Sequence, residues 1–163
     1  DAEIEEETRT LLAPFERTGG ESPYAVHHAL QDCMDRLVGI FRTEGDLTRA
    51  LEELSRLRAR AAAVRVEGSR RYNPGWHLAR DVQNLLTVSE AITRSALLRK
   101  ESRGAHSRLD FTATDPAFGG VNHCVKKSPS GMSVTATPLP AMPAELKALF
   151  DAAPAREPAG RAS

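Results

Sequence analysis

A dense run of charged and hydroxyl side chains between positions 99 and 108 is the part of the sequence best suited to chemistry. Guanidinium groups hold carboxylates and phosphates through paired hydrogen bonds, and an imidazole can exchange a proton near neutral pH. The run therefore predicts a corner that docks a partner or binds an anion, and its candidate residues are Arg99, Arg103, His106 and Arg108. The alternative is that these cations only stabilise the negative end of a preceding helix, each by about 0.3–1 kcal/mol.

The other side chains that could bind a metal or take part in a reaction are poorly spaced for a shared site. His27 and His28 are adjacent, so on a helix they point about 100° apart and make poor joint metal ligands. Cys33 follows six residues after His27, which is also a poor chelating spacing. We expect Cys33 and Cys124 to pack as small apolar groups, Trp76 to anchor the start of a helix, and no metal to be bound.

The familiar signatures of nucleotide and hydrolytic enzymes are missing from the sequence. It contains no G-x-G-x-x-G or G-x-x-x-x-G-K-[ST] phosphate loop, no G-x-S-x-G elbow and no H-E-x-x-H helix. This argues against an independent nucleotide-binding enzyme.

Composition narrows the choice of partner and compartment. The 163 residues carry 22 Lys and Arg against 22 Asp and Glu, and this zero net charge disfavours broad binding to nucleic acid. No apolar run approaches the roughly 18 residues that span a bilayer, so we expect no direct membrane insertion. Two distant cysteines and the lack of a leader pattern favour a reducing, cytoplasmic location. The chain begins at Asp1 rather than Met, so we expect that catalytic machinery lies upstream.

Three amphipathic segments follow one another along the chain. Ser22-Pro23 and Asn73-Pro74 each place a capping side chain before a proline, which is typical of a helix start. Apolar residues then recur three or four positions apart, which predicts helices from 23 to about 41, from 46 to about 64 and from 74 to about 102. In the last helix the predicted apolar stripe consists of Leu78, Val82, Leu85, Leu86, Ser89, Ile92 and Ala96. We expect a mainly α fold, an antiparallel three-helix bundle like a spectrin repeat.

Shorter elements flank the predicted bundle. A short N-terminal helix should break at Pro14 and at Gly19-Gly20. Residues 121–126 and 132–137 could pair as a β-hairpin, and residues 144–150 could form a short helix. The predicted organisation is an N-terminal helix and loop (1–20), the bundle (21–111), a hairpin-like extension (112–150) and a disordered tail (151–163).

Several stretches resemble the C-terminal domain of the flavoprotein subunit of succinate dehydrogenase and fumarate reductase. In the family order, and across about residues 23–111, they are Asp32-Cys33-Met34, Val38-Gly39-Ile40-Phe41-Arg42-Thr43-Glu44, Leu47, Ala50-Leu51, Tyr72-Asn73-Pro74, Trp76, Asn84-Leu85-Leu86, Ser89-Glu90-Ala91, Ala96-Leu97 and Arg99-Lys100-Glu101-Ser102-Arg103-Gly104-Ala105-His106. The last stretch is highly specific to the family, and the wording around Trp76 looks most like its actinobacterial branch.

The resemblance implies a three-helix bundle within a parent enzyme that carries covalently bound FAD. Such a parent interconverts succinate and fumarate and passes electrons to an iron–sulfur subunit, on the inner face of the bacterial plasma membrane. The family's flavin-linking and substrate-binding residues precede the matched region, so we assign no catalytic residue and expect no FAD on this chain alone. The implied partners are the flavin-binding domain of the same polypeptide and the iron–sulfur subunit.

Some features depart from the family and leave alternatives open. Residues 108–112 read Arg-Leu-Asp-Phe-Thr where the family usually has Arg-Glu-Asp-Tyr-Pro, and a common tryptophan is absent, with Phe118 standing nearby. L-aspartate oxidase has a related domain and is one alternative. A free-standing helical interaction module is another. An isolated domain would also expose apolar surface and could dimerise.

Overall fold

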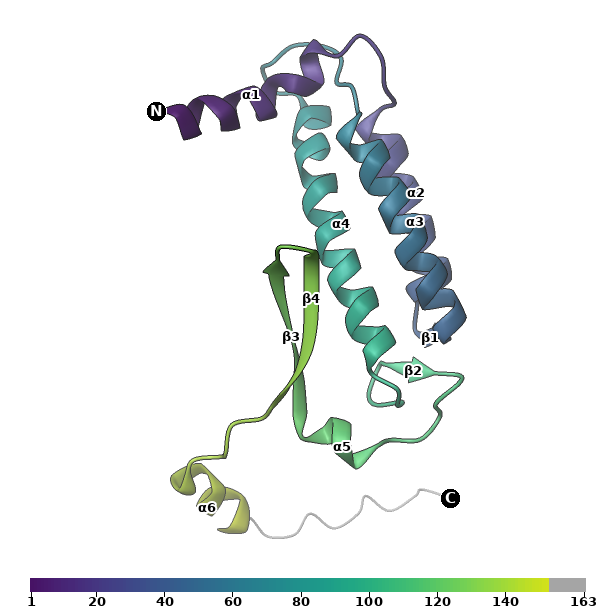
Figure 1. Ribbon diagram of the computed structural model, residues 1–163, viewed down its shortest axis with the longest axis vertical. Coiled ribbons are helices and arrows are strands. Elements are labelled where there is room, and N and C mark those ends of the chain that lie inside the picture. The colour runs from purple at the N-terminus through teal and green to yellow at the C-terminus, as the bar shows by residue number, and fades with distance from the viewer. Residues whose placement is uncertain (153–163) are drawn as a thin grey trace, which may run out of the picture.

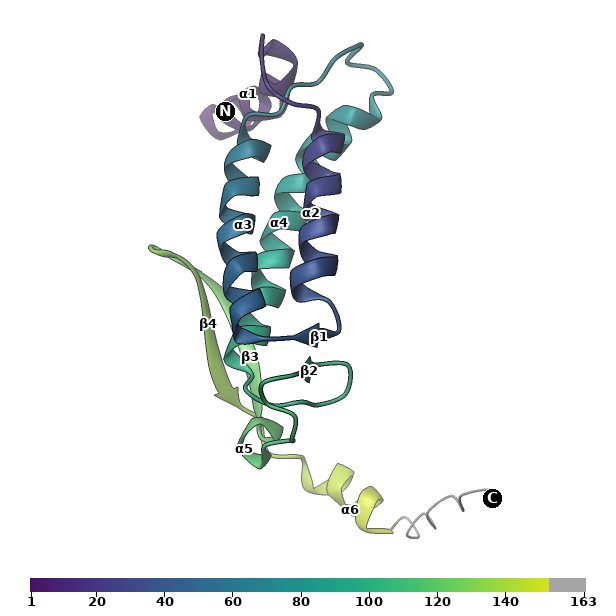
Figure 2. The ribbon, with the colours of Figure 1, turned by 90° about the vertical axis from the view of Figure 1, so that its right-hand side faces the viewer.

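The computed structural model describes residues 1–152 and shows three long helices lying side by side. They are α2 (Pro23–Val38), α3 (Glu44–Ala62) and α4 (Pro74–Leu98), and successive helices run in opposite directions (Figures 1 and 2). The predicted antiparallel three-helix bundle is therefore confirmed.

Each of the three helices begins at a side-chain cap. The Ser22 hydroxyl accepts from the amide of Tyr24 at 3.3 Å, and the Asn73 side chain accepts from the amide of Trp76 at 3.1 Å. Proline follows both caps, as the sequence predicted. Helix α3 begins at Glu44, two residues earlier than expected, because Thr43 acts as its cap and accepts from the Asp46 amide at 3.1 Å.

The core lies between the three helices, but the predicted stripe of α4 was wrong at two positions. Leu85 and Ile92 are 39% and 45% exposed. Thr93 is buried in their place, with its hydroxyl donating to the Ser89 carbonyl at 2.7 Å. The buried residues of α4 are Ala79, Val82, Leu86, Ser89, Thr93 and Ala96. One apolar side of α4 is thus left outside the core.

The two cysteines differ in accessibility. Cys33 is 1% exposed within the core, and burial raises the pKa of its thiol, whereas Cys124 is partly exposed. We predict that a thiol reagent modifies one cysteine of the native chain quickly and Cys33 at least about 100-fold more slowly, because Cys33 must wait for unfolding. Cys124→Ser should remove the fast phase, and two fast thiols in the native chain would contradict the assignment.

Helix α4 ends at Leu98, four residues before the expected boundary. The backbone at Arg99 is extended, and the chain then turns back beneath the bundle. There the two-residue strands β1 (Phe41–Arg42) and β2 (Ser107–Arg108) pair in parallel, which the sequence did not predict.

Two further elements project from the bundle. Helix α1 (Ala2–Glu16) continues through Pro14, so the predicted break there was wrong. The Trp76 indole at the start of α4 holds α1 by donating to the Leu11 carbonyl at 2.7 Å. After α5 (Pro116–Gly119), strands β3 (Val121–Ser128) and β4 (Gly131–Pro138) form the predicted antiparallel hairpin, slightly longer than expected.

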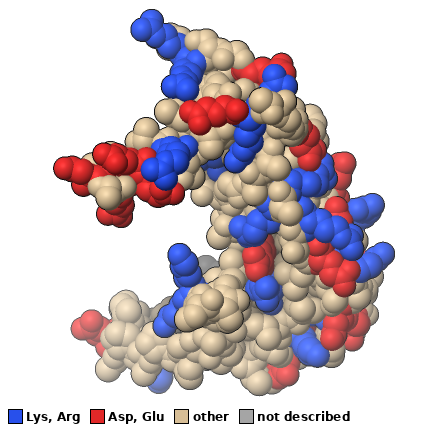
Figure 3. Space-filling view, turned by 45° about the horizontal axis from the view of Figure 1, so that its top comes forward, with Lys and Arg blue, Asp and Glu red and all other residues tan. Residues whose placement is uncertain are grey.

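The C-terminal helix α6 (Ala144–Ala152) includes the predicted 144–150 helix and the first two residues of the predicted disordered tail. The rest of that tail lies outside the described residues. The N-terminal arm α1 and the hairpin extend from the same side of α4, which leaves a concave face between them (Figures 1 and 3). Among the helices of residues 1–152, none is long and apolar enough to cross a bilayer.

Candidate functional site

A tight turn brings the charged cluster back under the end of α4. The amide of Arg103 donates to the carbonyl of His106 at 2.8 Å, and the reverse bond is 3.1 Å. Gly104 lies at the tip with a φ of +59°, a conformation that favours glycine. The turn places all four predicted residues, Arg99, Arg103, His106 and Arg108, around the C-terminal end of α4.

Arg108 is fully buried and caps two helices at once. Its Nη1 donates to the carbonyls of Ala96, Leu97 and Arg99, at 3.0, 3.3 and 3.4 Å. Its Nε and Nη2 hold both oxygens of Asp110, at 2.7 and 2.8 Å. The Asp110 carboxylate also accepts from the Glu44 amide at 2.8 Å, at the start of α3. Arg108 therefore has the capping role that the sequence left as the alternative, and its side chain cannot contact a partner directly.

The ion pair holds Asp110 in its charged form. Hydrogen bonding from Arg108 lowers the pKa of Asp110 far below its ordinary value, and the Glu44 amide adds to this effect. A charged Asp110 suits the N-terminal end of α3, where the helix dipole is positive.

Glu101 is a buried carboxylate at the centre of the cluster. Arg103 donates to both of its oxygens, at 2.9 and 3.0 Å, and the Asp115 amide donates at 2.7 Å. Arg99 completes the set with a further ion pair. These bonds, led by that from Arg103, overcome the effect of burial and lower the pKa of Glu101 to about 2.

His106 is held from both sides of its ring. Arg42 donates to its Nδ1 at 2.7 Å, and its Nε2 lies 3.0 Å from the carbonyl of Arg99. Because a guanidinium can only donate, Nδ1 accepts and the proton sits on Nε2. Burial lowers the pKa of His106, and the charges of Arg42, Arg108 and Arg99 lower it further. His106 is thus a neutral bridge between the end of β1 and the end of α4.

The sequence missed three members of this network. Arg42 lies 64 residues before His106, so no local pattern links them. Glu101 and Asp110 were overlooked as site residues, although an acidic residue between basic ones was the available signal. Of the four predicted residues, Arg103 has the most accessible side chain, at 43% exposed. The cluster consequently presents few free donors to a partner.

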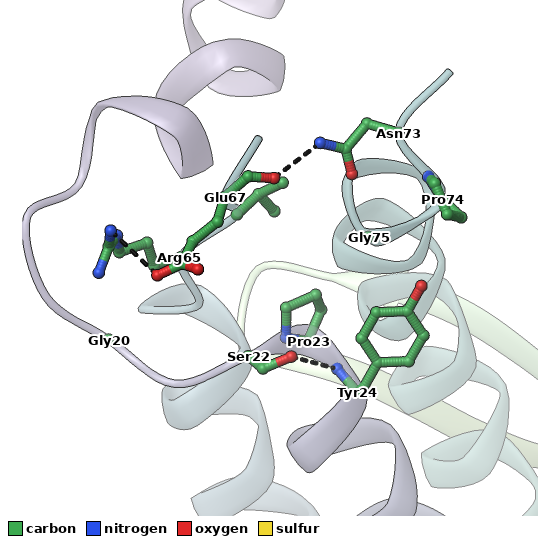
Figure 4. Close-up of a pocket in the computed structure, with 10 residues that line it drawn as sticks. Gly20, Ser22, Pro23, Tyr24, Arg65, Glu67, Asn73, Pro74 and Gly75 are labelled. Carbon is green, nitrogen blue, oxygen red and sulfur yellow. Dashed lines mark hydrogen bonds and ion pairs between the residues drawn. The ribbon is translucent and has the colours of Figure 1, made fainter. Parts of the chain in front are cut away.

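Among the cavities that border the bundle, two lie at its opposite ends. The first, of about 370 Å³, lies between the starts of α2 and α4 (Figure 4). Its polar groups bind one another: Asn73 donates to the Glu67 carbonyl at 2.8 Å, and Arg65 pairs with Glu67 at 3.1 Å. The second, of about 390 Å³, lies between α4 and the hairpin beside His106.

The described part of the chain contains no group of three or more His, Cys, Asp and Glu side chains that could hold a metal. His27 is half-buried and His28 is exposed. The geometry therefore defines a small helical domain whose clustered charges join helix ends, without an assembled catalytic set among residues 1–152.

Comparison with known proteins gives this domain a family. The model for the C-terminal region of the fumarate reductase flavoprotein matches residues 27–148. The chain belongs to this family, the C-terminal domains of succinate dehydrogenase and fumarate reductase flavoproteins.

Particular relatives agree with this assignment. The chain is 38% identical over 98 residues to the fumarate reductase flavoprotein subunit of Helicobacter pylori J99, covering 60% of this chain and 14% of that protein. It is 36% identical over 98 residues to the corresponding Mycobacterium tuberculosis H37Rv subunit, covering 60% and 17%. The structure of Mycobacterium smegmatis Sdh1 in complex with UQ1 superimposes with a TM-score of 0.85 at 39% identity, over 93% of this chain and 26% of that one.

More distant structures share the fold alone. Adenylylsulfate reductase from Archaeoglobus fulgidus gives a TM-score of 0.75 at 22% identity, over 86% of this chain and 25% of that one. The chain spans only 14% and 17% of the two curated relatives named above.

Proposed function

We propose that this chain acts as the C-terminal domain of an FAD-dependent succinate:acceptor oxidoreductase, packing on the flavin-binding domain and supporting subunit assembly. Family membership over residues 27–148 is the observation that carries the proposal. The described residues do not themselves fit a dinucleotide-type flavin site, because no connection from a strand to a following helix among residues 1–152 is glycine-rich. FAD and the succinate–fumarate chemistry are accordingly proposed for the rest of the flavoprotein.

The apolar side of α4 is the proposed contact with the flavin-binding domain. Leu85, Val88 and Ile92 are 39%, 56% and 45% exposed at positions i, i+3 and i+7, which lie on one side of a helix. Helix α1 and the hairpin flank this part of α4 (Figure 1). A row of exposed apolar side chains within a concave face is typical of a surface that a neighbouring domain covers.

The charged cluster is the proposed docking corner for the iron–sulfur subunit. Arg103 is the accessible member of this cluster. Arg99, His106 and Arg108 stabilise the turn through bonds within the chain. An exposed guanidinium that is already oriented by Glu101 loses little freedom when it meets a carboxylate of a partner. The assembled complex would lie peripherally on the inner face of the bacterial plasma membrane, and either direction of the reaction fits this arrangement.

Val88→Asp provides the test in the full-length flavoprotein. Covering the new carboxylate with an apolar surface would leave it unpaired, so we expect the midpoint of thermal unfolding of the flavoprotein to fall by roughly 5 °C or more. The measurement is flavin fluorescence during a thermal ramp.

Two controls make this result specific. In the 163-residue chain alone Val88 is exposed, so Val88→Asp should change stability by less than about 0.5 kcal/mol. Gln31→Asp adds the same charge at an exposed position of α2 and should leave the unfolding midpoint of the flavoprotein unchanged. Equal unfolding curves for wild type and Val88→Asp would refute the proposed contact.

A further inference from the structure

Arg42 is a half-buried cation without a carboxylate. Its Nε donates to the carbonyls of Val38 and Gly39, at 3.0 and 2.7 Å, and its Nη1 donates to His106. None of the ion pairs among residues 1–152 involves Arg42, and none of their hydrogen bonds uses its Nη2. Since no buried side-chain nitrogen in this part of the chain lacks a partner, the free Nη2 is open to solvent.

The cavity of about 390 Å³ between α4 and the hairpin is the space that Arg42 borders. Its other titratable lining groups are Arg99 on the α4 side, His106 from the turn and His123 from β3. The nearby carboxylates are already committed, Glu101 to Arg99 and Arg103, and Asp110 to Arg108. The cavity therefore has an excess of positive charge that none of the carboxylates among residues 1–152 balances by an ion pair with Arg42.

Apart from Ser95, the rest of the cavity wall is apolar. Ala91 and Ile92 line it from α4 and Val125 from β3, and the two larger side chains are 45% and 41% exposed. One charged end beside an apolar wall matches a ligand with one carboxylate on a short alkyl body. A doubly charged anion would place its second charge against Ile92 or Val125.

We propose that this cavity binds a carboxylate on a short alkyl chain, with the carboxylate on Arg42 and the alkyl part against Ile92 and Val125. The same chemistry is offered by a free monocarboxylic acid and by a glutamate side chain of a polypeptide covering α4. The carboxylate site itself does not depend on the proposed function. Its occupation by a glutamate of a covering polypeptide does rest on that function.

The two histidines report on occupancy of the cavity. Burial lowers the pKa of His123, and the charge of Arg99 lowers it further. Burial also lowers the pKa of His106, and the charges of Arg42, Arg108 and Arg99 add to this effect. A bound carboxylate would offset these charges, so the pKa of both histidines should rise when the site fills. A structural role for Arg42 alone would produce no such ligand-dependent shift.

The experiment is a titration of the 163-residue chain with sodium butyrate, followed by the NMR signals of the histidine rings. We expect saturable shifts at His106 and His123 with a dissociation constant on the order of 1–10 mM. Acetate, which lacks two CH₂ groups, should bind roughly tenfold more weakly, and sodium chloride should give no saturable shift.

Three variants complete the test. Arg42→Gln should abolish the shifts, whereas Arg56→Gln removes the same charge from an exposed i,i+3 pair on α3 and should retain them. Val125→Asp places a carboxylate in the cavity at an exposed hairpin position, and should also abolish binding without disturbing the bundle. The inference is overturned if butyrate gives no saturable shift, if chloride reproduces it, or if Val125→Asp binds like the wild type.

Titration of the full-length flavoprotein then separates the two sources. A butyrate response there assigns the site to a free acid. The other result is that butyrate causes no change because the His106 ring signals already have the chemical shifts of the butyrate-bound chain. This result assigns the site to a glutamate of the covering polypeptide. If Val88→Asp fails to lower the unfolding temperature of the full-length flavoprotein while the isolated chain binds butyrate, the proposed domain contact fails and the carboxylate site stands.

Discussion

Replacing Arg108 with alanine is expected to cost about 3–5 kcal/mol of folding free energy, because it breaks a buried ion pair by removing one partner. The carbonyls of Ala96 and Leu97 at the end of α4 lose the Arg108 donor, and Asp110 at the start of α3 loses its counterion. Urea denaturation of the 163-residue chain, followed by the helical circular dichroism signal, measures the change.

Comparison with two other variants isolates the cause. Arg108→Lys keeps the charge but cannot hold both oxygens of Asp110, so it should recover only part of the loss. Arg56→Ala removes an arginine of an exposed pair and should cost less than about 1 kcal/mol. If Arg108→Ala also costs less than about 1 kcal/mol, Arg108 does not join the ends of α3 and α4 as described.

The bundle could be predicted because its helix starts are determined locally. A capping side chain bonds an amide two or three residues further on, so Ser22-Pro23 and Asn73-Pro74 identify the starts of α2 and α4 without knowledge of tertiary structure. The hairpin was also predictable, since two β-prone runs flank a short turn.

The register of α4 could not be obtained from hydrophobicity alone. The pattern treats every apolar residue as core, whereas Leu85 and Ile92 point away from α2 and α3, and buried Thr93 satisfies its own hydroxyl within the helix. When a helix has apolar residues on two sides, its sequence does not show which side faces the core of its own domain and which side another domain covers.

The four predicted residues of the charged cluster lie close together in the structure, but the bonds that they make depend on contacts between distant residues. The pairing of β1 with β2 brings Arg42 to His106, and the fold-back after α4 buries Arg108 against carbonyls that no sequence pattern marks. The run from 99 to 108 carries four Lys and Arg against one Glu, and only the fold shows that Glu101 and Asp110 neutralise most of these cations. What remains is one accessible guanidinium on Arg103 and one free donor on Arg42.

The second large effect is expected for Glu101→Gln. Glutamine has one acceptor oxygen and no charge, so Arg99 and Arg103 would be left together without their shared counterion. We expect the melting temperature of the 163-residue chain at pH 7 to fall by roughly 5–10 °C. Differential scanning calorimetry gives the change, and Glu53→Gln, which removes a carboxylate from an exposed pair, should shift it by less than about 2 °C.

The pH dependence of this effect distinguishes a charge role from a packing role. The pKa of Glu101 is about 2 in the folded chain and 4.5 as its ordinary value, so its stabilising contribution is complete above pH 4.5 and is lost as the pH falls toward 2. The gap between wild type and Glu101→Gln should therefore be widest above pH 4.5 and narrow below it. Asp110, whose pKa is also lowered, weakens both proteins alike on acidification and cancels from the difference. A gap that stays constant from pH 7 to pH 2.5 would mean that Glu101 acts through its shape rather than its charge.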